Sequence, residues 1–254
     1  MMCGTRLSLG LCAGLSFVLC LGCIGCMQAP GKPGPGPEVP LPTEVIAFST
    51  LYGQNCAGCH GKDGKGGAAI PLANPVYLAF AGEAIFRKIT ANGVAGSLMP
   101  GFATSAGGLL TDAQIDSLVS GIYRTWGRPE VLSGSYPPPY QATLPPNQVE
   151  GQKAFTEFCA ECHGADGKGV KAPAANQAHL VSGSITDPAY LALVSDQSLR
   201  STIVAGWPDE GMPDWRSDSR SAARAMTDQE ITDVVAWIGA QRTTYSGQPQ
   251  VSQR

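Results

Sequence analysis

The chain carries the same five-residue pattern twice, and its residue types are those that attach a porphyrin to a protein. The pattern is C-x-x-C-H, and its defining residues are Cys56, Cys59, His60, Cys159, Cys162 and His163. Two thiols three residues apart lie on one face of a helical turn, where each can add to one vinyl group of a porphyrin. The histidine that follows is placed to give its imidazole to the iron. We therefore expect a covalently attached haem c at each motif.

The pair of cysteines alone would also fit a zinc knuckle, a redox dithiol or a plain disulfide. A zinc site would need four thiolates to converge from two segments about a hundred residues apart, and it would leave both motif histidines without a role. A redox dithiol needs no histidine at this place. Because the chain has only three histidines and two of them occupy this position, the pattern favours haem.

Composition excludes one class of partner and limits the use of the remaining cysteines. The chain has 254 residues, enough for one or two domains, and a formal net charge of −3. It has no basic run of the kind that binds nucleic acid, so we expect no nucleic-acid partner. Of its nine cysteines, four belong to the motifs and five precede residue 27. The folded part is therefore predicted to have no structural disulfide.

The N-terminus has the composition of a targeting segment. Leu7–Met27 is an almost unbroken apolar run, and Arg6 is the only charge before it. Cys23 and Cys26 each follow a small residue, which resembles a bacterial lipoprotein signal with a lipidated cysteine. An uncleaved helix that spans the bilayer is the alternative. Either would tether the protein to a membrane on the outer, periplasmic side, where haem is also attached to C-x-x-C-H motifs.

Proline-rich stretches divide the chain into segments. A run that alternates proline and glycine follows the apolar segment, and a second proline-rich stretch separates the two haem motifs. The predicted segments are 1–26 for the signal or membrane anchor, 27–43 for an extended tether, 44–128 for a first domain, 129–146 for a linker, 147–242 for a second domain and 243–254 for a polar tail.

Hydrophobic spacing predicts that both domains are helical. A short helix leads into Cys56, and another from Pro75 to Asn92 ends at Gly93. Capping-box sequences at Thr111 and Thr227 each begin a last helix. Each last helix has an apolar stripe at i, i+3, i+4 and i+7, formed by Ile115, Leu118, Val119 and Ile122 in the first and by Ile231, Val234, Val235 and Ile238 in the second.

The second domain repeats the first. The haem motifs match at an offset of 103 residues, and Pro71 matches Pro173 at an offset of 102. From the helix that begins at Pro75 onward, the offset is 113. The increase from 102 to 113 implies an insertion of eleven residues in the second half, Gln177–Asp187.

This alignment selects the sixth ligand of each iron. At the same offset of 113, Met99 matches Met212, and each is followed by proline. A thioether is a soft neutral donor that suits haem iron and raises its potential. Met27 precedes both domains, and Met226 has no counterpart in the first half. Met99 and Met212 are therefore the predicted ligands, with His179 in the insertion as a rival for the second haem.

With these motifs, both halves resemble class I cytochrome c domains, and residues 44–242 together resemble a diheme cytochrome c. The resemblance rests on the C-x-x-C-H-G run, the Met-Pro loop and the terminal helix. It implies an all-α fold of two tandem domains, each wrapped around one covalent haem c. In that family, a carbonyl of a proline-containing loop accepts a hydrogen bond from the ligand histidine, and Pro71 and Pro173 occupy the corresponding places.

The family also crosses its first and last helices closely, which requires a small residue at the contact. In the alignment, Phe48 matches Gly151, and Gly121 matches Trp237. The large and small residues are therefore exchanged between the two halves. We predict that Phe48 packs over Gly121 and that Trp237 packs over Gly151, which keeps the interior volume similar.

A haem held by histidine and methionine has no open position for a substrate, so we expect electron transfer and assign no catalytic residue. The chain resembles the diheme subunits of some haem–copper oxidases and the cytochrome subunits of periplasmic dehydrogenases. This resemblance implies a tethered carrier or the cytochrome subunit of a respiratory complex, with redox proteins or other subunits as partners. Two alternatives stay open: an enzyme akin to the diheme cytochrome c peroxidases, and a haem-based ligand sensor.

Overall fold

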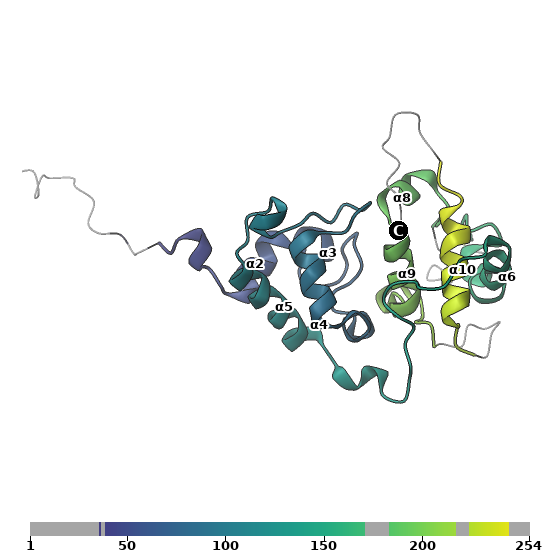
Figure 1. The fold of residues 1–254 in the computed structure, drawn as a ribbon, viewed down its shortest axis with the longest axis horizontal. Coiled ribbons are helices and arrows are strands. Elements are labelled where there is room, and N and C mark those ends of the chain that lie inside the picture. The colour runs from purple at the N-terminus through teal and green to yellow at the C-terminus, as the bar shows by residue number, and fades with distance from the viewer. Residues whose placement is uncertain (1–35, 37–38, 171–182, 217–223, 244–254) are drawn as a thin grey trace, which may run out of the picture. The chain divides into compact units, whose positions relative to one another are not determined.

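The structure is a computed structural model, and Figure 1 shows the arrangement of its helices. It describes residues 36, 39–170, 183–216 and 224–243. Within these ranges the regular structure is helical, with two isolated β-bridges and no strand. The predicted all-α fold is therefore confirmed. Over the same ranges, no helix combines the length and the apolar character needed to cross a bilayer.

Several residues with predicted roles lie outside the described ranges. They are the lipidation candidates Cys23 and Cys26, the second loop proline Pro173, and the rival ligand His179. The residues from Pro42 to Arg254 form one compact unit, which contains both halves of the repeat. Below, residues 42–128 are the first lobe, residues 147–243 are the second lobe, and residues 129–146 are the linking segment.

The first lobe has four α-helices. They are α2 (Phe48–Asn55), α3 (Ala57–His60), α4 (Pro75–Asn92) and α5 (Asp112–Trp126). Short 3-10 turns lie at Pro42–Glu44 and Thr104–Ala106. The side chain of Gln114 on α5 donates to the carbonyls of Pro42 and Val45, so the start of the lobe is fastened to its last helix.

In its described residues, the second lobe repeats this order with one more α-helix. It consists of α6 (Gln148–Phe158), α7 (Ala160–His163), α8 (Pro188–Leu193), α9 (Asp196–Ala205) and α10 (Asp228–Gly239). The additional helix arises because α8 and α9 are separated at Ser195, which caps α9 with its side chain.

The predicted continuous helix from Pro75 to Asn92 needs a correction, because α4 is kinked. Gly82 has φ +71° and ψ 152° in the middle of it. At the offset of 113, Gly82 matches Ser195, so both lobes interrupt this helix at the same place. A glycine reaches positive φ without steric cost, which allows the first lobe to break the helix without a capping side chain.

Both predicted capping boxes are present and both predicted apolar stripes are buried. Thr111 with Gln114, and Thr227 with Glu230, exchange the reciprocal bonds that satisfy the first amides of α5 and α10. Every residue of the two stripes is 7% exposed or less. Gly93 follows α4 directly, as predicted. Local sequence signals therefore define the first and last turns of the helices that form the core.

The predicted exchange of large and small residues at the helix crossings is also confirmed. A Cβ added at Gly121 would lie 2.9 Å from Cβ of Phe48 and closer still to its ring. A Cβ added at Gly151 would lie 3.0 Å from Cβ of Trp237. At Gly151 the nearest atom is the backbone carbonyl of Asp233, so α6 and α10 cross with their backbones almost in contact.

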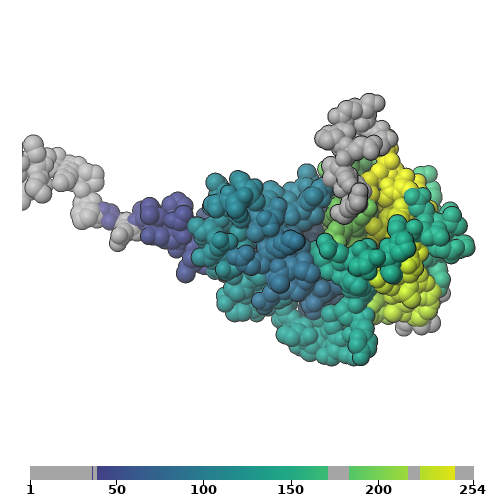
Figure 2. All heavy atoms as spheres, viewed as in Figure 1, coloured from purple at the N-terminus to yellow at the C-terminus, as the bar shows by residue number. Residues whose placement is uncertain are grey.

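The linking segment is folded onto the second lobe. Arg200 of α9 is only 2% exposed, and two of its nitrogens donate to the carbonyl of Pro139, at 3.0 and 2.8 Å. Its other partners are Thr232, at 3.1 Å, and the carboxylate of Asp228. In Figure 2 this teal segment runs over the surface of the protein. The bonds from the guanidinium fix it in place there.

Glu230 provides a test of the second capping box by pH. Hydrogen bonds from Arg224 lower its pKa from 4.5 to about 2. The charged carboxylate therefore stabilises the fold fully above pH 4.5, and this contribution is lost as the pH falls toward 2. We expect Glu230→Gln to lower the free energy of unfolding by about 1 kcal/mol at neutral pH and to flatten its pH dependence below 4.5.

The first lobe shows why glutamine is a suitable substitute, because Gln114 completes the same box without a charge. Chemical denaturation of the two proteins at a series of pH values measures the effect. If Glu230→Gln kept the full slope of the parent protein below pH 4.5, another carboxylate would be responsible.

Candidate haem sites

The first motif is held between two short helices. α2 ends at Asn55, immediately before Cys56, and α3 carries Cys59 and His60. Gly61 then ends α3 with φ +82°, and a side chain at this position would collide with the backbone of the following loop. The hydroxyl of Tyr52 donates to the Gly61 carbonyl at 2.8 Å, so α2 also fixes the turn behind the histidine.

His60 has the environment of an iron ligand. Its ring is 8% exposed, and Nδ1 lies 2.8 Å from the carbonyl oxygen of Ile70. Such a bond fixes the tautomer with the proton on Nδ1, and it leaves Nε2 as the atom that can bind iron. Burial lowers the pKa of His60, which favours the neutral ring that a metal requires. Ile70 directly precedes Pro71, so the acceptor is in the predicted loop.

The second motif repeats this arrangement up to the acceptor. α7 ends at His163, and burial lowers the pKa of this histidine as well. Among the described residues, its Nδ1 is a buried atom without a hydrogen-bond partner. The alignment places the counterpart of Ile70 at Ala172, next to Pro173, and both are outside the described ranges.

The motif cysteines do not have the character of a redox dithiol. None of the four is in a disulfide. Burial, together with the neighbouring cysteine, raises the pKa of Cys56 to about 11 and that of Cys159 to about 12. A nucleophilic dithiol instead has a lowered thiol pKa. The raised pKa values of Cys56 and Cys159 are thus unlike those of a redox dithiol, and the covalent attachment of haem stays a prediction.

The two methionine loops share one backbone hydrogen bond. The amide of Val94 donates to the Met99 carbonyl at 3.1 Å, and the amide of Trp207, its counterpart, donates to the Met212 carbonyl at 2.8 Å. Both methionines are half-buried. Met226, in contrast, is 9% exposed and belongs to the core. The structure thus supports the alignment of Met99 with Met212 in the repeat. Their binding to iron stays a prediction.

Two contributors to the site were missed by reasoning from the sequence. Tyr52 binds the turn after the first motif, and its counterpart Phe155 instead stacks on Trp237 with a centroid distance of 4.5 Å. Asn74 had no predicted role, and the structure gives it contacts in both lobes. The only sequence signal for Asn74 was its position directly before Pro75, which is typical of a helix cap.

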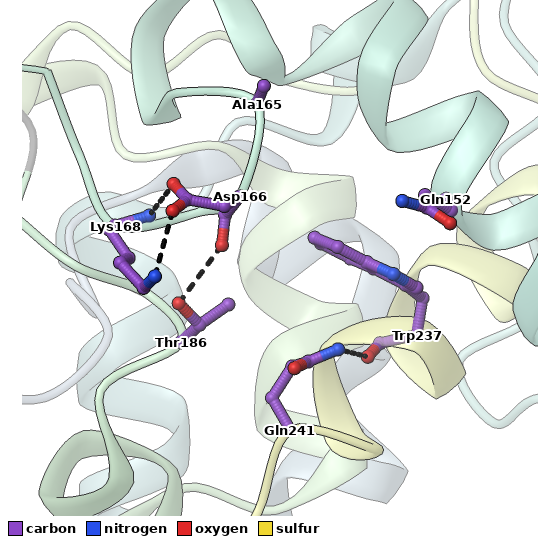
Figure 3. Close-up of a pocket in the computed structure, with 7 residues that line it drawn as sticks. All are labelled: Gln152, Ala165, Asp166, Lys168, Thr186, Trp237 and Gln241. Atoms are coloured by element: carbon purple, nitrogen blue, oxygen red, sulfur yellow. Dashed lines mark hydrogen bonds and ion pairs between the residues drawn. The ribbon is translucent and has the colours of Figure 1, made fainter.

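A cavity of about 460 Å³ lies in the second lobe (Figure 3). It is lined by Gln152, Ala165, Asp166, Lys168, Thr186, Trp237 and Gln241. Lys168 and Asp166 form an ion pair of 3.0 Å beside it. None of the predicted haem ligands lines this cavity, so we assign it no part in the site.

Comparison with protein families identifies both lobes. Residues 148–241 match the family model described as cytochrome c. Residues 45–120 match the model described as cytochrome c oxidase, cbb3-type, subunit III. Each match covers one of the two C-x-x-C-H motifs together with the helix on either side of it.

Curated relatives share part of this chain. Over 136 residues the chain is 33% identical to the cbb3-type cytochrome c oxidase subunit FixP of Sinorhizobium medicae. This alignment covers 49% of this chain and 40% of FixP. Over 205 residues it is 28% identical to the cbb3-type cytochrome c oxidase subunit CcoP of Rhodobacter capsulatus. This alignment covers 76% of this chain and 60% of CcoP. The chain thus spans about half the length of the curated relatives it matches.

Among solved structures, a chain of a reducing HAO-like protein complex from Kuenenia stuttgartiensis aligns with 81% of this chain and with all of its own length. The sequence identity is 19% and the TM-score is 0.45.

Proposed function

Because this chain carries two cytochrome c domains, we propose that it transfers single electrons through a haem c attached to each of them. The observation that carries this proposal is the duplication of a complete donor set. Each lobe has two candidate attachment thiols, a histidine that is buried in the first lobe and half-buried in the second, and a methionine on a matching loop. A haem iron bound in this way supplies reversible one-electron exchange.

In the first lobe, each residue has a definite task. Cys56 and Cys59 would hold the haem through thioether bonds, and His60 and Met99 would bind its iron. The Ile70 carbonyl keeps the proton on Nδ1 of His60, and the lobe's apolar core limits the access of water. In the second lobe, Cys159, Cys162, His163 and Met212 would take the same parts. An iron held by both a histidine and a methionine would have no free position for a substrate.

The relatives suggest where such a protein works. Two of them are named as subunits of cbb3-type cytochrome c oxidases, which supports a role as a cytochrome subunit of a respiratory complex. A carrier tethered to the membrane through Cys23 or Cys26, or through an uncleaved N-terminal helix, is the form we propose for a protein that acts alone. In both forms the lobes would lie on the periplasmic side and would exchange electrons with redox proteins or neighbouring subunits.

Anaerobic oxidation of the fully reduced, haem-loaded chain tests the proposal. We expect a one-electron oxidant such as ferricyanide to remove two electrons per chain, one from each domain. We expect neither turnover of hydrogen peroxide nor binding of carbon monoxide at neutral pH. Peroxide turnover would instead support the peroxidase alternative, and carbon monoxide binding would support the sensor alternative.

A further inference from the structure

Asn74 makes hydrogen bonds in both lobes at once. It is 3% exposed and stands at the start of α4. Its side-chain oxygen accepts from the amides of Val76 and Tyr77, at 2.9 and 3.2 Å. Its side-chain nitrogen donates to the carbonyls of Ala205 and Gly206 in the second lobe, at 3.0 and 3.2 Å. One amide therefore caps a helix and bridges the lobes.

The repeat separates these two functions. In the second lobe the residue directly before the matching helix is Asp187, the last residue of the insertion, and it caps α8 in the same way by accepting from the amides of Ala189 and Tyr190, at 2.8 and 3.1 Å. A carboxylate is therefore sufficient for the cap. What asparagine adds in the first lobe is the pair of N–H donors, and both are used across the lobes.

Both ends of this bridge lead to predicted iron ligands. The backbone amide of Asn74 donates to the Pro71 carbonyl at 3.3 Å, and Pro71 follows the carbonyl that holds His60. On the other side, Gly206 precedes Trp207, whose amide is bonded to the Met212 carbonyl. A short series of covalent and hydrogen bonds thus connects the histidine loop of the first lobe to the methionine loop of the second.

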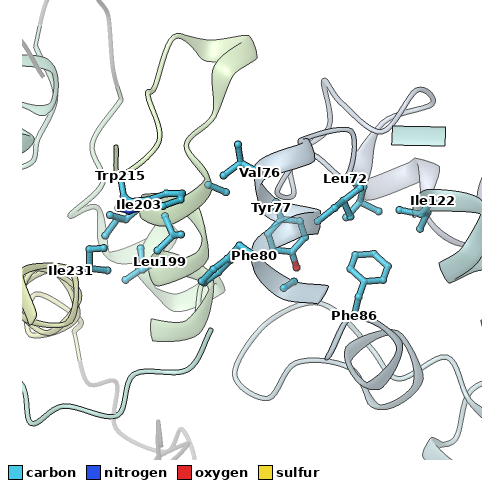
Figure 4. Packing of buried hydrophobic residues seen from close by; sticks show 14 of the residues in the cluster. Leu72, Val76, Tyr77, Phe80, Phe86, Ile122, Leu199, Ile203, Trp215 and Ile231 are labelled. Carbon is cyan, nitrogen blue, oxygen red and sulfur yellow. The ribbon is translucent and has the colours of Figure 1, made fainter. Parts of the chain in front are cut away.

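Other contacts support the bridge. Figure 4 shows Phe80 of α4 directed toward Leu199 and Ile203 of α9. The ring of Phe80 also lies 5.3 Å from that of Tyr140 in the linking segment. Asn74 borders a cavity of about 360 Å³ that is lined by both lobes, and Lys65 pairs weakly with Asp209 across it, at 3.9 Å. Of these contacts, that of Asn74 is the buried one with short hydrogen bonds, whereas the Lys65–Asp209 pair is long and exposed.

We propose that Asn74 is a positioning residue that holds the histidine loop of the first lobe against the methionine loop of the second, and so sets the rate of electron transfer between the haems that the two lobes would carry. This inference rests on the proposed function. The transfer moves one electron from ferrous to ferric iron, and no bond of the protein forms or breaks. The connection between the lobes makes the chain a relay rather than a pair of independent carriers.

Asn74→Asp in the full haem-loaded chain is the decisive variant. It keeps the cap that Asp187 demonstrates, and it places carboxylate oxygens against the carbonyls of Ala205 and Gly206. Half-reduced protein is excited by a light pulse, and the redistribution of the electron between the haems is timed. We expect the rate of electron transfer between the haems to fall roughly tenfold to a hundredfold, because a small displacement of one ligand loop from the other has a large effect on the rate. Asp187→Asn, the reverse exchange at an exposed cap, should leave the rate unchanged.

Asn74→Ser covers the possibility that the aspartate variant fails to fold, because serine also caps a helix and has no amide donor. Amide hydrogen exchange provides a readout independent of electron transfer, and both Asn74 variants should exchange faster at Trp207. Rates within twofold of the parent in a folded Asn74 variant would overturn the proposal. No transfer between the haems of the parent chain would likewise overturn the proposal, whereas failure of the ferricyanide oxidation would overturn the proposed function.

Discussion

Replacing Met99 by alanine is expected to lower the reduction potential of the first haem by roughly 0.2 V, a quarter of the ~0.8 V range that axial ligands span. The thioether favours ferrous iron, so its removal favours the ferric state and makes the haem harder to reduce. Met212→Ala should have the same effect on the second haem alone. Each variant should also bind carbon monoxide in the reduced state, because one axial position becomes open.

Potentiometric titration of the parent chain and the two variants measures these shifts. Met226→Leu is the matched control, because this buried methionine lies in the core and its replacement conserves volume. It should leave both potentials where they are. A potential that falls in Met226→Leu, or one that does not change in Met99→Ala, would show that the ligands have been assigned to the wrong residues.

Gly151→Ala should be the most destabilising single-methyl change in the second lobe. Alanine is the better helix former by about 1 kcal/mol, so an unobstructed site would gain stability. Here the added Cβ would collide with the backbone carbonyl of Asp233 and would lie 3.0 Å from Cβ of Trp237. A backbone atom of a packed helix cannot move aside without separating α6 from α10. We expect a net loss of about 1–3 kcal/mol in the free energy of unfolding.

Gly53→Ala is the matched control for this prediction. Gly53 lies in α2, the first-lobe counterpart of α6, and a Cβ added there would have no atom within 4 Å. It should stabilise the chain by about 0.5–1 kcal/mol. Chemical denaturation of the haem-loaded proteins measures both values. Equal effects of the two alanines would show that α6 and α10 do not cross as closely as described.

The parts of the fold that sequence reasoning predicted well are those encoded locally. Capping boxes, apolar stripes and the C-x-x-C-H motif are each read within about ten residues, and each appears where expected. The exchange of Phe48 and Gly121 for Gly151 and Trp237 could be predicted because the chain repeats itself, so that one lobe shows what the other must accommodate. Duplication therefore served as an internal alignment.

The parts that were missed depend on contacts between distant segments. The break at Gly82 was hidden because apolar spacing continues through it, and a glycine within a helical pattern is ambiguous. The burial of Arg200 was not predictable from its counterpart Arg87, which is 40% exposed and pairs with Asp116 on the surface. The difference comes from the Pro139 carbonyl of the linking segment, 61 residues away.

Iron K-edge X-ray absorption tests the ligand set most directly, because it counts the sulfur atoms bound to each metal. The haem-loaded parent chain is predicted to show one sulfur per iron, from Met99 in the first lobe and Met212 in the second. Met99→Ala and Met212→Ala should each reduce the average to one half. An absence of iron-bound sulfur in the parent chain, or no decrease in either variant, would contradict the assignment of both haems as His/Met electron carriers.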